Sequence, residues 1–294
     1  MVSLSHDARP ARSGAAAAPV ALSGALLVLA LAFLYAPLWQ ACWKEWWQEG
    51  SAYSHGILIP PLALLMVWYR RDELERLVRR PALTGLALVL LGLALQLFAH
   101  WGCSTMLSWA SFLMLITGGI AFVAGWAATA RLLPPLLFLT FMVPMSAMLT
   151  QPLVFGAQMI STRVAVLLLR AMQFQVHQLG TIIQMENYTL QVALPCSGFK
   201  TLIALSAFAA CFTYLLRGSL PRKLLLFGTA IVLSVVVNGL RISLVGVTGE
   251  LVSSAAASWV HDNGGLPVTT LALGGLYLMA RILKCPLAAP GSQS

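Results

Sequence analysis

The residue in this chain best placed for covalent chemistry is Cys196. It lies in Leu190-Gln-Val-Ala-Leu-Pro-Cys196-Ser197-Gly198-Phe-Lys200-Thr201, where an alternating apolar run ends and a continuous apolar run begins. The alternation predicts a short strand, and the continuous run predicts a membrane helix. The partial positive charge of a helix N-terminus favours a thiolate. Most cysteines in apolar proteins only pack, so a nucleophile at this position requires partners.

Arg241 is the second candidate, because apolar residues flank it on both sides within a predicted span. An arginine inside a span is costly and indicates function or an internal partner. Asn238 lies three residues earlier and shares its helix face. The pair could donate hydrogen bonds to an oxyanion or a substrate carbonyl. The simpler interpretation is that Arg241 extends its side chain to the outer interface.

His261 is the third candidate, in a predicted loop rich in turn residues just before the last apolar run. Histidine beside cysteine is the minimum for an activated thiolate, with the imidazole acting first as base and then as acid. A loop histidine is more often simply solvated. What favours chemistry here is that the predicted topology brings Cys196, Arg241 and His261 to one membrane face.

The elements that must position these residues are membrane helices. The 294 residues are 59% hydrophobic and 9% charged, whereas a soluble domain carries roughly 25% charged residues. This composition excludes an ordinary soluble domain. We expect eight spans, the first retained rather than cleaved as a signal peptide: residues 19–38, 57–69, 82–99, 105–125, 132–148, 199–216, 224–247 and 266–283.

The distribution of basic residues predicts the orientation. With the N-terminus inside, thirteen of the 18 Lys and Arg residues fall on the cytoplasmic side. The other five are Lys44, Arg163, Arg170, Lys200 and Arg241. We therefore expect both termini inside and Cys196 on the outer face. The net charge of +9 then anchors the protein in the membrane and does not indicate nucleic-acid binding.

The segment 149–198 is the longest predicted outside the core spans. Its residues 151–170 form a helix that is either interfacial or embedded, and the charge distribution favours a helix that does not cross. Residues 174–194 predict a small extracytoplasmic β-hairpin directly before Cys196. The expected fold class is an all-α polytopic membrane protein with this hairpin. Its parts are a disordered cytoplasmic tail (1–18), the membrane domain (19–284) and a second cytoplasmic tail (285–294).

The five cysteines show no Cys-x-x-Cys spacing, and no His-Glu-x-x-His motif is present, so no metal and no cofactor are expected. A bridge between Cys42 and Cys103 on the outer face is an option that the spacing neither requires nor excludes.

Four motifs in this order resemble the exosortase/archaeosortase family: Tyr53-Ser-His55-Gly, Cys196-Ser-Gly, Asn238-x-x-Arg241, and His261 before the final span. The resemblance covers about residues 39–283. It implies an exosortase of the bacterial inner membrane, a cysteine protease or transpeptidase of the hydrolase class. Its partners would be exported proteins that end in a PEP-CTERM-type sorting signal: a Pro-Glu-Pro-like motif, a transmembrane helix and a basic tail.

The resemblance implies catalytic roles for Cys196, Arg241 and His261, with Cys196 forming an acyl-thioester. Arg241 is often assigned as proton donor in the family, but a guanidinium remains protonated, so we expect His261 to carry the proton. Asn238, Ser197, Gly198, Lys200 and His55 are expected to support the site. Lys200 departs from the arginine that many relatives carry, and its charge could lower the pKa of Cys196. His55 is either structural or positions the substrate.

Two questions stay open at this level. The acceptor of the acyl group could be an amine or water, because both reactions share the acyl-enzyme. The alternative from another class is a transporter or channel in which Arg241 binds an anionic substrate. Cys196→Ala would abolish processing by the enzyme and leave transport intact.

Overall fold

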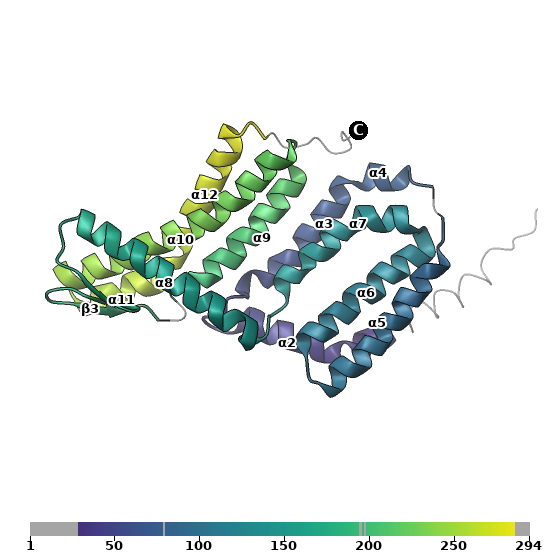
Figure 1. The fold of residues 1–294 in the computed structure, drawn as a ribbon, viewed down its shortest axis with the longest axis horizontal. Helices are drawn as coiled ribbons and strands as arrows, with labels where there is room; N and C mark the ends of the chain where they lie inside the picture. The colour runs from purple at the N-terminus through teal and green to yellow at the C-terminus, as the bar shows by residue number, and fades with distance from the viewer. Residues whose placement is uncertain (1–28, 79, 194–195, 197, 286–294) are drawn as a thin grey trace, which may run out of the picture.

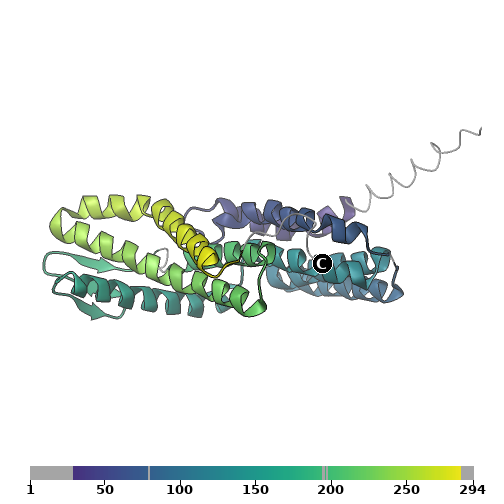
Figure 2. The same ribbon diagram turned by 90° about the horizontal axis from the view of Figure 1, so that it is seen from above.

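The computed structural model describes residues 29–78, 80–193, 196 and 198–285. Its helices form two groups that lie side by side (Figures 1 and 2). The first group runs from α2 to the short 3-10 helix η2, and the second from α8 to α12. The expected tail 1–18, the first half of the first span (19–38) and all but Cys285 of the second tail lie outside the described residues.

The first group consists of helices joined by short turns. Its core contains Tyr35, Trp109 and Phe138, and the hydroxyl groups of Tyr35 and Ser111 share a hydrogen bond of 2.6 Å. The elements are α2 (Ala36–Trp47), η1 (Ser54–Leu58), α3 (Ile59–Tyr69), α4 (Arg71–Glu75), α5 (Leu83–Trp101), α6 (Thr105–Ala124), α7 (Trp126–Phe138) and η2 (Leu139–Met142).

Small residues let α5 and α6 approach closely, as is common in membrane bundles. A Cβ atom added at Gly85 would lie 2.4 Å from the backbone nitrogen of Phe122, and one added at Gly118 would lie 2.7 Å from the carbonyl oxygen of Gly85. Ser111 also donates to the carbonyl of Gly92 at 2.8 Å. These contacts hold α5 and α6 together as a tight pair at the edge of the molecule.

The second group carries Cys196 and its surroundings. It consists of α8 (Ala147–Ala171), α9 (Phe199–Leu215), α10 (Leu220–Leu251), α11 (Ser254–Asn263) and α12 (Gly265–Ile282). Leu205, Leu226 and Leu276 meet in the core between α9, α10 and α12. The 32-residue α10 extends beyond that core to the region where α8, the strands and α11 gather (Figure 1).

The predicted hairpin is a three-stranded antiparallel sheet in order β1-β2-β3, made of His177–Leu179, Ile182–Gln184 and Thr189–Gln191. Gln178 pairs with Ile183, and Ile183 pairs with Leu190. The inner side of the sheet packs on Leu169 of α8 and Ile242 of α10, with Cys196 in the same cluster. The chain leaves β3 only a few residues before the cysteine.

Within the part of the chain that the structure describes, five helices are long and apolar enough to cross a membrane, by length and composition: α5, α6, α8, α10 and α12. Three shorter apolar helices, over 54–69, 126–142 and 199–215, coincide largely with other expected spans. Helix α8, which we expected not to cross, lies across the direction shared by α9 and α12 in Figure 1. Its length therefore permits a span, while its direction matches an interfacial helix.

The expected span 132–148 was placed too far along the chain. Helix α7 begins at Trp126, directly after Gly125 with its φ of 90°, and the helical segment ends at Met142. The reason is Pro144, which disfavours helical backbone at the preceding residue; Val143 is extended, with ψ at 127°. The Cys42–Cys103 bridge is also absent, because all five cysteines are free, with Cys42 buried and Cys103 exposed.

Candidate active site

Cys196 lies between β3 and α9, with only 6% of its surface exposed. Its backbone N–H donates to the carbonyl of Ala193 at 2.9 Å. Its side chain packs in the cluster that contains Leu169, Val192 and Ile242. The cysteine is thus held where the sheet meets the start of α9.

Gly198 allows α9 to begin so soon after the cysteine. Its φ of +80° is a left-handed conformation that residues with a Cβ rarely adopt. A Cβ there would also lie 2.8 Å from the side-chain nitrogen of Asn238. Glycine is therefore required both by the backbone conformation and by the neighbour on α10.

Asn238 is fully enclosed, with 1% of its surface exposed, and its amide donates to the carbonyl oxygen of Cys196 at 3.0 Å. We expected Asn238 and Arg241 to donate jointly to a substrate oxygen. The structure instead uses the Asn238 amide to fix the backbone of the cysteine. In this geometry Asn238 holds the backbone that carries the Cys196 thiol.

His261 supplies the group that contacts the thiol: its Nε2 is hydrogen-bonded to the Sγ of Cys196. The expected loop 248–265 is in fact mostly helical, and His261 lies in the last turn of α11. Ser253 caps that helix by accepting from the N–H of Ala256 at 3.1 Å, and three consecutive alanines follow. Serine before a run of strong helix formers is a start signal that the interpretation as a loop overlooked.

Asp262 completes the arrangement around the imidazole. Its Oδ1 lies 3.0 Å from His261 Nδ1, so a proton on Nδ1 leaves the Nε2 lone pair directed at the thiol. Sequence reasoning did not select Asp262, although a carboxylate adjacent to a candidate histidine was visible. The side chains of His261 and Asp262 are 38% and 73% exposed, so solvent reaches both.

Arg241 links α10 to this histidine. One terminal N–H donates to the backbone carbonyl of His261, while the buried Nε has no hydrogen-bond partner among the described residues. A Cβ at Gly264 would lie 3.3 Å from that Nε. Arg241 therefore retains an unused donor and is positioned from α10 rather than extended to the interface.

The electrostatics favour a neutral thiol at rest. Burial raises the pKa of Cys196 above its ordinary value, the positive charge of Arg241 opposes that rise, and the negative charge of Asp262 adds to it. Burial is the largest of the three effects. A neutral thiol beside an imidazole lone pair can react only if the imidazole takes its proton as the sulfur attacks.

A small cavity of about 20 Å³ adjoins the sulfur, enough for roughly one water molecule. Its lining combines residues of β3 and α10 with the candidate site residues: Leu190, Gln191, Val192, Cys196, Arg241, Ile242, Val245 and His261. The residues that the cavity joins come from four separate segments of the chain. A substrate carbonyl placed there would lie against the sulfur, Arg241 and His261.

The supporting residues lie in different places. Lys200 is exposed in the first turn of α9, and His55, in η1, is 8% exposed and interacts electrostatically with Lys200. The carbonyls of Ala52 and Phe141 lie near the His55 ring, but neither ring nitrogen completes a hydrogen bond with a described residue. His55 does not line the cavity. Ser197 lies outside the described residues.

The fold and these contacts define a polytopic helical membrane protein with a thiol–imidazole–carboxylate arrangement at one end of its second helix group. The family model for transmembrane exosortases matches residues 46–278. The chain therefore belongs to the transmembrane exosortase family, as the order of its motifs indicated. Comparisons with curated proteins and with solved structures gave no match.

Proposed function

We propose that this exosortase is a membrane-embedded cysteine protease or transpeptidase that removes C-terminal sorting signals from exported proteins. The observation that carries the proposal is the hydrogen bond between Cys196 Sγ and His261 Nε2, with Asp262 at the other ring nitrogen. A buried cysteine that only packed would need no imidazole beside it. The contact between His261 on α11 and Cys196, which lies just before α9, matches the geometry of an activated nucleophile.

In the first step, His261 Nε2 accepts the thiol proton while Sγ bonds to the carbonyl carbon of the scissile peptide. The tetrahedral oxygen becomes negative, and Arg241, which lines the cavity and whose Nε–H has no partner among the described residues, is a donor that can stabilise it. The backbone N–H of Cys196 already donates to Ala193 and does not serve this role. We assign Arg241 to the oxyanion and to holding the end of α11.

In the second step, the C–N bond breaks and the new N–H of His261 protonates the leaving amine, which departs with the transmembrane helix and basic tail. A thioester remains on Cys196. An incoming amine or water then loses a proton to His261 Nε2 and attacks the thioester, which regenerates the thiol. The residues present serve either acceptor equally.

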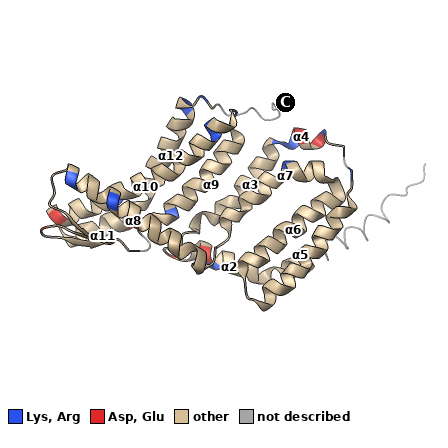
Figure 3. Ribbon diagram, viewed as in Figure 1, with Lys and Arg blue, Asp and Glu red and all other residues tan. Residues whose placement is uncertain are grey.

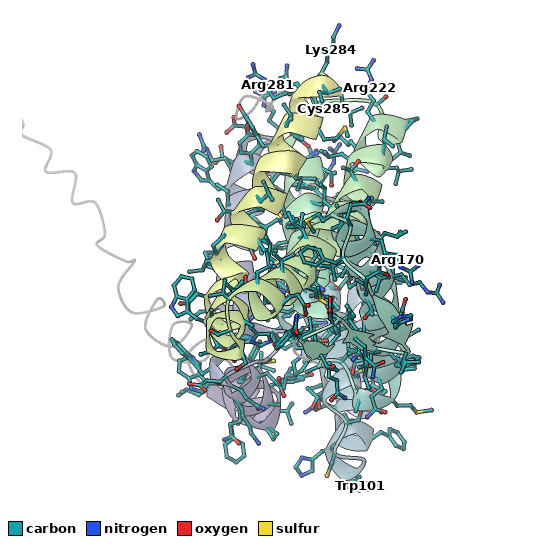
Figure 4. All side chains as sticks on the ribbon, turned by 90° about the vertical axis from the view of Figure 1, so that its left-hand side faces the viewer. Trp101, Arg170, Arg222, Arg281, Lys284 and Cys285 are labelled. Carbon is teal, nitrogen blue, oxygen red and sulfur yellow. The ribbon has the colours of Figure 1, made fainter. Side chains whose placement is uncertain are left out.

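The proposed orientation has both termini in the cytoplasm and Cys196 at the outer face of a bacterial cytoplasmic membrane. In Figure 3, Lys and Arg mark the end of α12 near the C-terminus and the region of α4 and α7, while others lie on α8 and near α2. Arg222, Arg281 and Lys284 lie together at this end of α12 in Figure 4. Clustered Lys and Arg in short loops favour the cytoplasmic side.

The test is co-expression with a tagged substrate that ends in a Pro-Glu-Pro-type motif, a transmembrane helix and a basic tail. Wild type is expected to remove the tail, and Cys196→Ala is expected to leave it in place. Cys103→Ala, which changes an exposed free cysteine, is the matched control and should process normally. Equal processing by wild type and Cys196→Ala would refute the cysteine mechanism.

A further inference from the structure

An apolar cleft of about 450 Å³ lies between the two helix groups, at the end of the bundle away from Cys196. Residues of α3, α7, η2, α9 and α10 form its walls: Met66, Pro134, Leu137, Phe138, Phe141, Ala210, Thr213, Tyr214, Leu220, Lys223, Leu224 and Phe227. Along α10 it extends from Leu220 to Phe227, about 10 Å of helix. It plays no part in the mechanism above.

One mouth of this cleft carries an excess of positive charge. Arg70 and Arg131 both donate to Glu73, at 3.1 and 2.6 Å. The guanidinium of Arg70 also lies 4.8 Å above the ring of Tyr214, which lines the cleft. Lys223, another lining residue, interacts electrostatically with Arg70. Two cations thus share one carboxylate, and Lys223 adds a third positive charge close to Arg70.

Lys223 is the cation best placed to receive a further anion. It is half-buried, it forms no ion pair with a carboxylate of the described residues, and the charge that acts on it most strongly is the positive charge of Arg70. Its neighbour Arg222 is exposed on the same helix and does not line the cleft. A half-buried ammonium beside Arg70 is stabilised by an anion that binds between the two.

We infer that this cleft is a binding site for an anionic phospholipid, with the phosphate at Lys223 and Arg70 and an acyl chain along the apolar walls. Basic pockets between membrane helices on the cytoplasmic side are suited to anionic head groups. Charge complementarity selects this occupant over a substrate helix with a basic tail, whose charges Lys223 and Arg70 would repel. A lipid bound there would contact α3, α7 and α9 together. Helix α9 begins at Phe199, just after Cys196.

Native mass spectrometry of the full chain, in detergent with equal phosphatidylglycerol and phosphatidylethanolamine, tests the site. Wild type is expected to retain phosphatidylglycerol preferentially. Lys223→Gln should lower that retention about fivefold, the effect of one basic residue near an anionic head group. Arg222→Gln removes the same charge from an exposed position and should change retention little. Equal retention of the two lipids, or equal losses in the two variants, overturns the proposal.

A second variant separates the lipid from other occupants. Ala210→Phe puts a larger apolar side chain into the cleft and changes no charge. The cleft becomes smaller, so we expect lower retention of both lipids. If lipid retention is unchanged while substrate processing is lost, the cleft holds the substrate helix and the inference is wrong. Because lipid retention is measured without substrate, its result stands independently of the proposed peptidase activity.

Discussion

At the scale of single residues, the proposed chemistry depends on how burial and two charged neighbours set the protonation state of one thiol. Cys196 is buried, and burial raises its pKa, while Arg241 and Asp262 act on it with opposite signs. Its reactivity toward a small alkylating reagent reports the thiolate fraction directly. That fraction is small at neutral pH and increases as the pH approaches the raised pKa.

Arg241→Gln and Asp262→Asn are expected to shift this reactivity in opposite directions. Loss of the arginine removes the effect that lowers the Cys196 pKa, so alkylation at a given pH becomes slower. Loss of the carboxylate removes an effect that raises it, so alkylation becomes faster. The measurement is the alkylation rate of the Cys196 peptide by mass spectrometry between pH 6 and 10. Shifts of the same sign in both variants would contradict the electrostatic account.

Asp262→Asn should nonetheless slow substrate processing while it speeds alkylation. The carboxylate holds a proton on His261 Nδ1, and without it the imidazole more often presents Nε2–H to the sulfur. Because Asp262 is 73% exposed, we expect a loss of about tenfold, less than the ~10⁴-fold effect of a buried triad aspartate. Glu186→Gln, an exposed carboxylate in the turn before β3, is the control. Unchanged processing in Asp262→Asn would remove Asp262 from the mechanism.

The sequence indicated which residues belong to this site better than it indicated which atoms they contact. Cys196 and His261 were selected because they lie next to predicted spans, and Arg241 because it is a charged residue inside one. The i, i+3 spacing of Asn238 and Arg241 correctly placed both on one face of α10. That spacing could not show that Asn238 binds the Cys196 carbonyl and Arg241 the His261 carbonyl. Cys196 and His261 lie 42 and 20 residues away from Asn238 and Arg241 in the sequence, so local spacing does not reveal these contacts.

At the scale of elements, the junction between the sheet and α9 depends on Gly198. Two glycines of the sheet region have positive φ, Gly198 at 80° and Gly180 at 61°. A Cβ at Gly180 would meet no atom within 4 Å, whereas one at Gly198 would meet the side chain of Asn238. A residue with a Cβ would be strained at either position, but only at Gly198 would it also clash with a neighbouring side chain.

Gly198→Ala is therefore expected to abolish processing, while Gly180→Ala should retain it. Each substitution places a Cβ in a left-handed conformation, which costs roughly 1–2 kcal/mol. Only Gly198→Ala also displaces Asn238 from the Cys196 carbonyl. The comparison requires thermal unfolding and substrate processing of both variants. Similar processing in the two would show that the Asn238 contact does not position the nucleophile.

Sequence reasoning succeeded for elements with strong local signals and failed where short signals compete. The apolar runs located α5, α6, α9, α10 and α12 closely. The turn residues Asp262 to Gly265 outweighed the Ser253 cap in our interpretation, so α11 was missed. The alternation before Cys196 indicated a hairpin. The sheet has a third strand because β1, only three residues long, adds to it, and so short a segment gives little sequence signal.

At the scale of the whole molecule, the charge distribution predicts the proposed orientation, with Cys196 on the outer side. The exposed Cys103 follows α5 near Trp101, and Trp101 lies at the end opposite Arg222 in Figure 4. A thiol reagent that cannot cross membranes should label Cys103 in intact spheroplasts. A cysteine introduced by Arg222→Cys, in a Cys103→Ala background, should be labelled only after lysis. The reverse pattern would invert the proposed topology.

The central claim is that Cys196 carries a covalent acyl intermediate. The wild-type enzyme is mixed with the tagged substrate and the reaction is stopped rapidly in acid. Digestion should then yield a Cys196 peptide joined through a thioester to the new C-terminus of the substrate. Neutral hydroxylamine should release that fragment as a hydroxamate. A tail that is removed without any hydroxylamine-sensitive adduct on Cys196, or an adduct on another cysteine, would contradict the account.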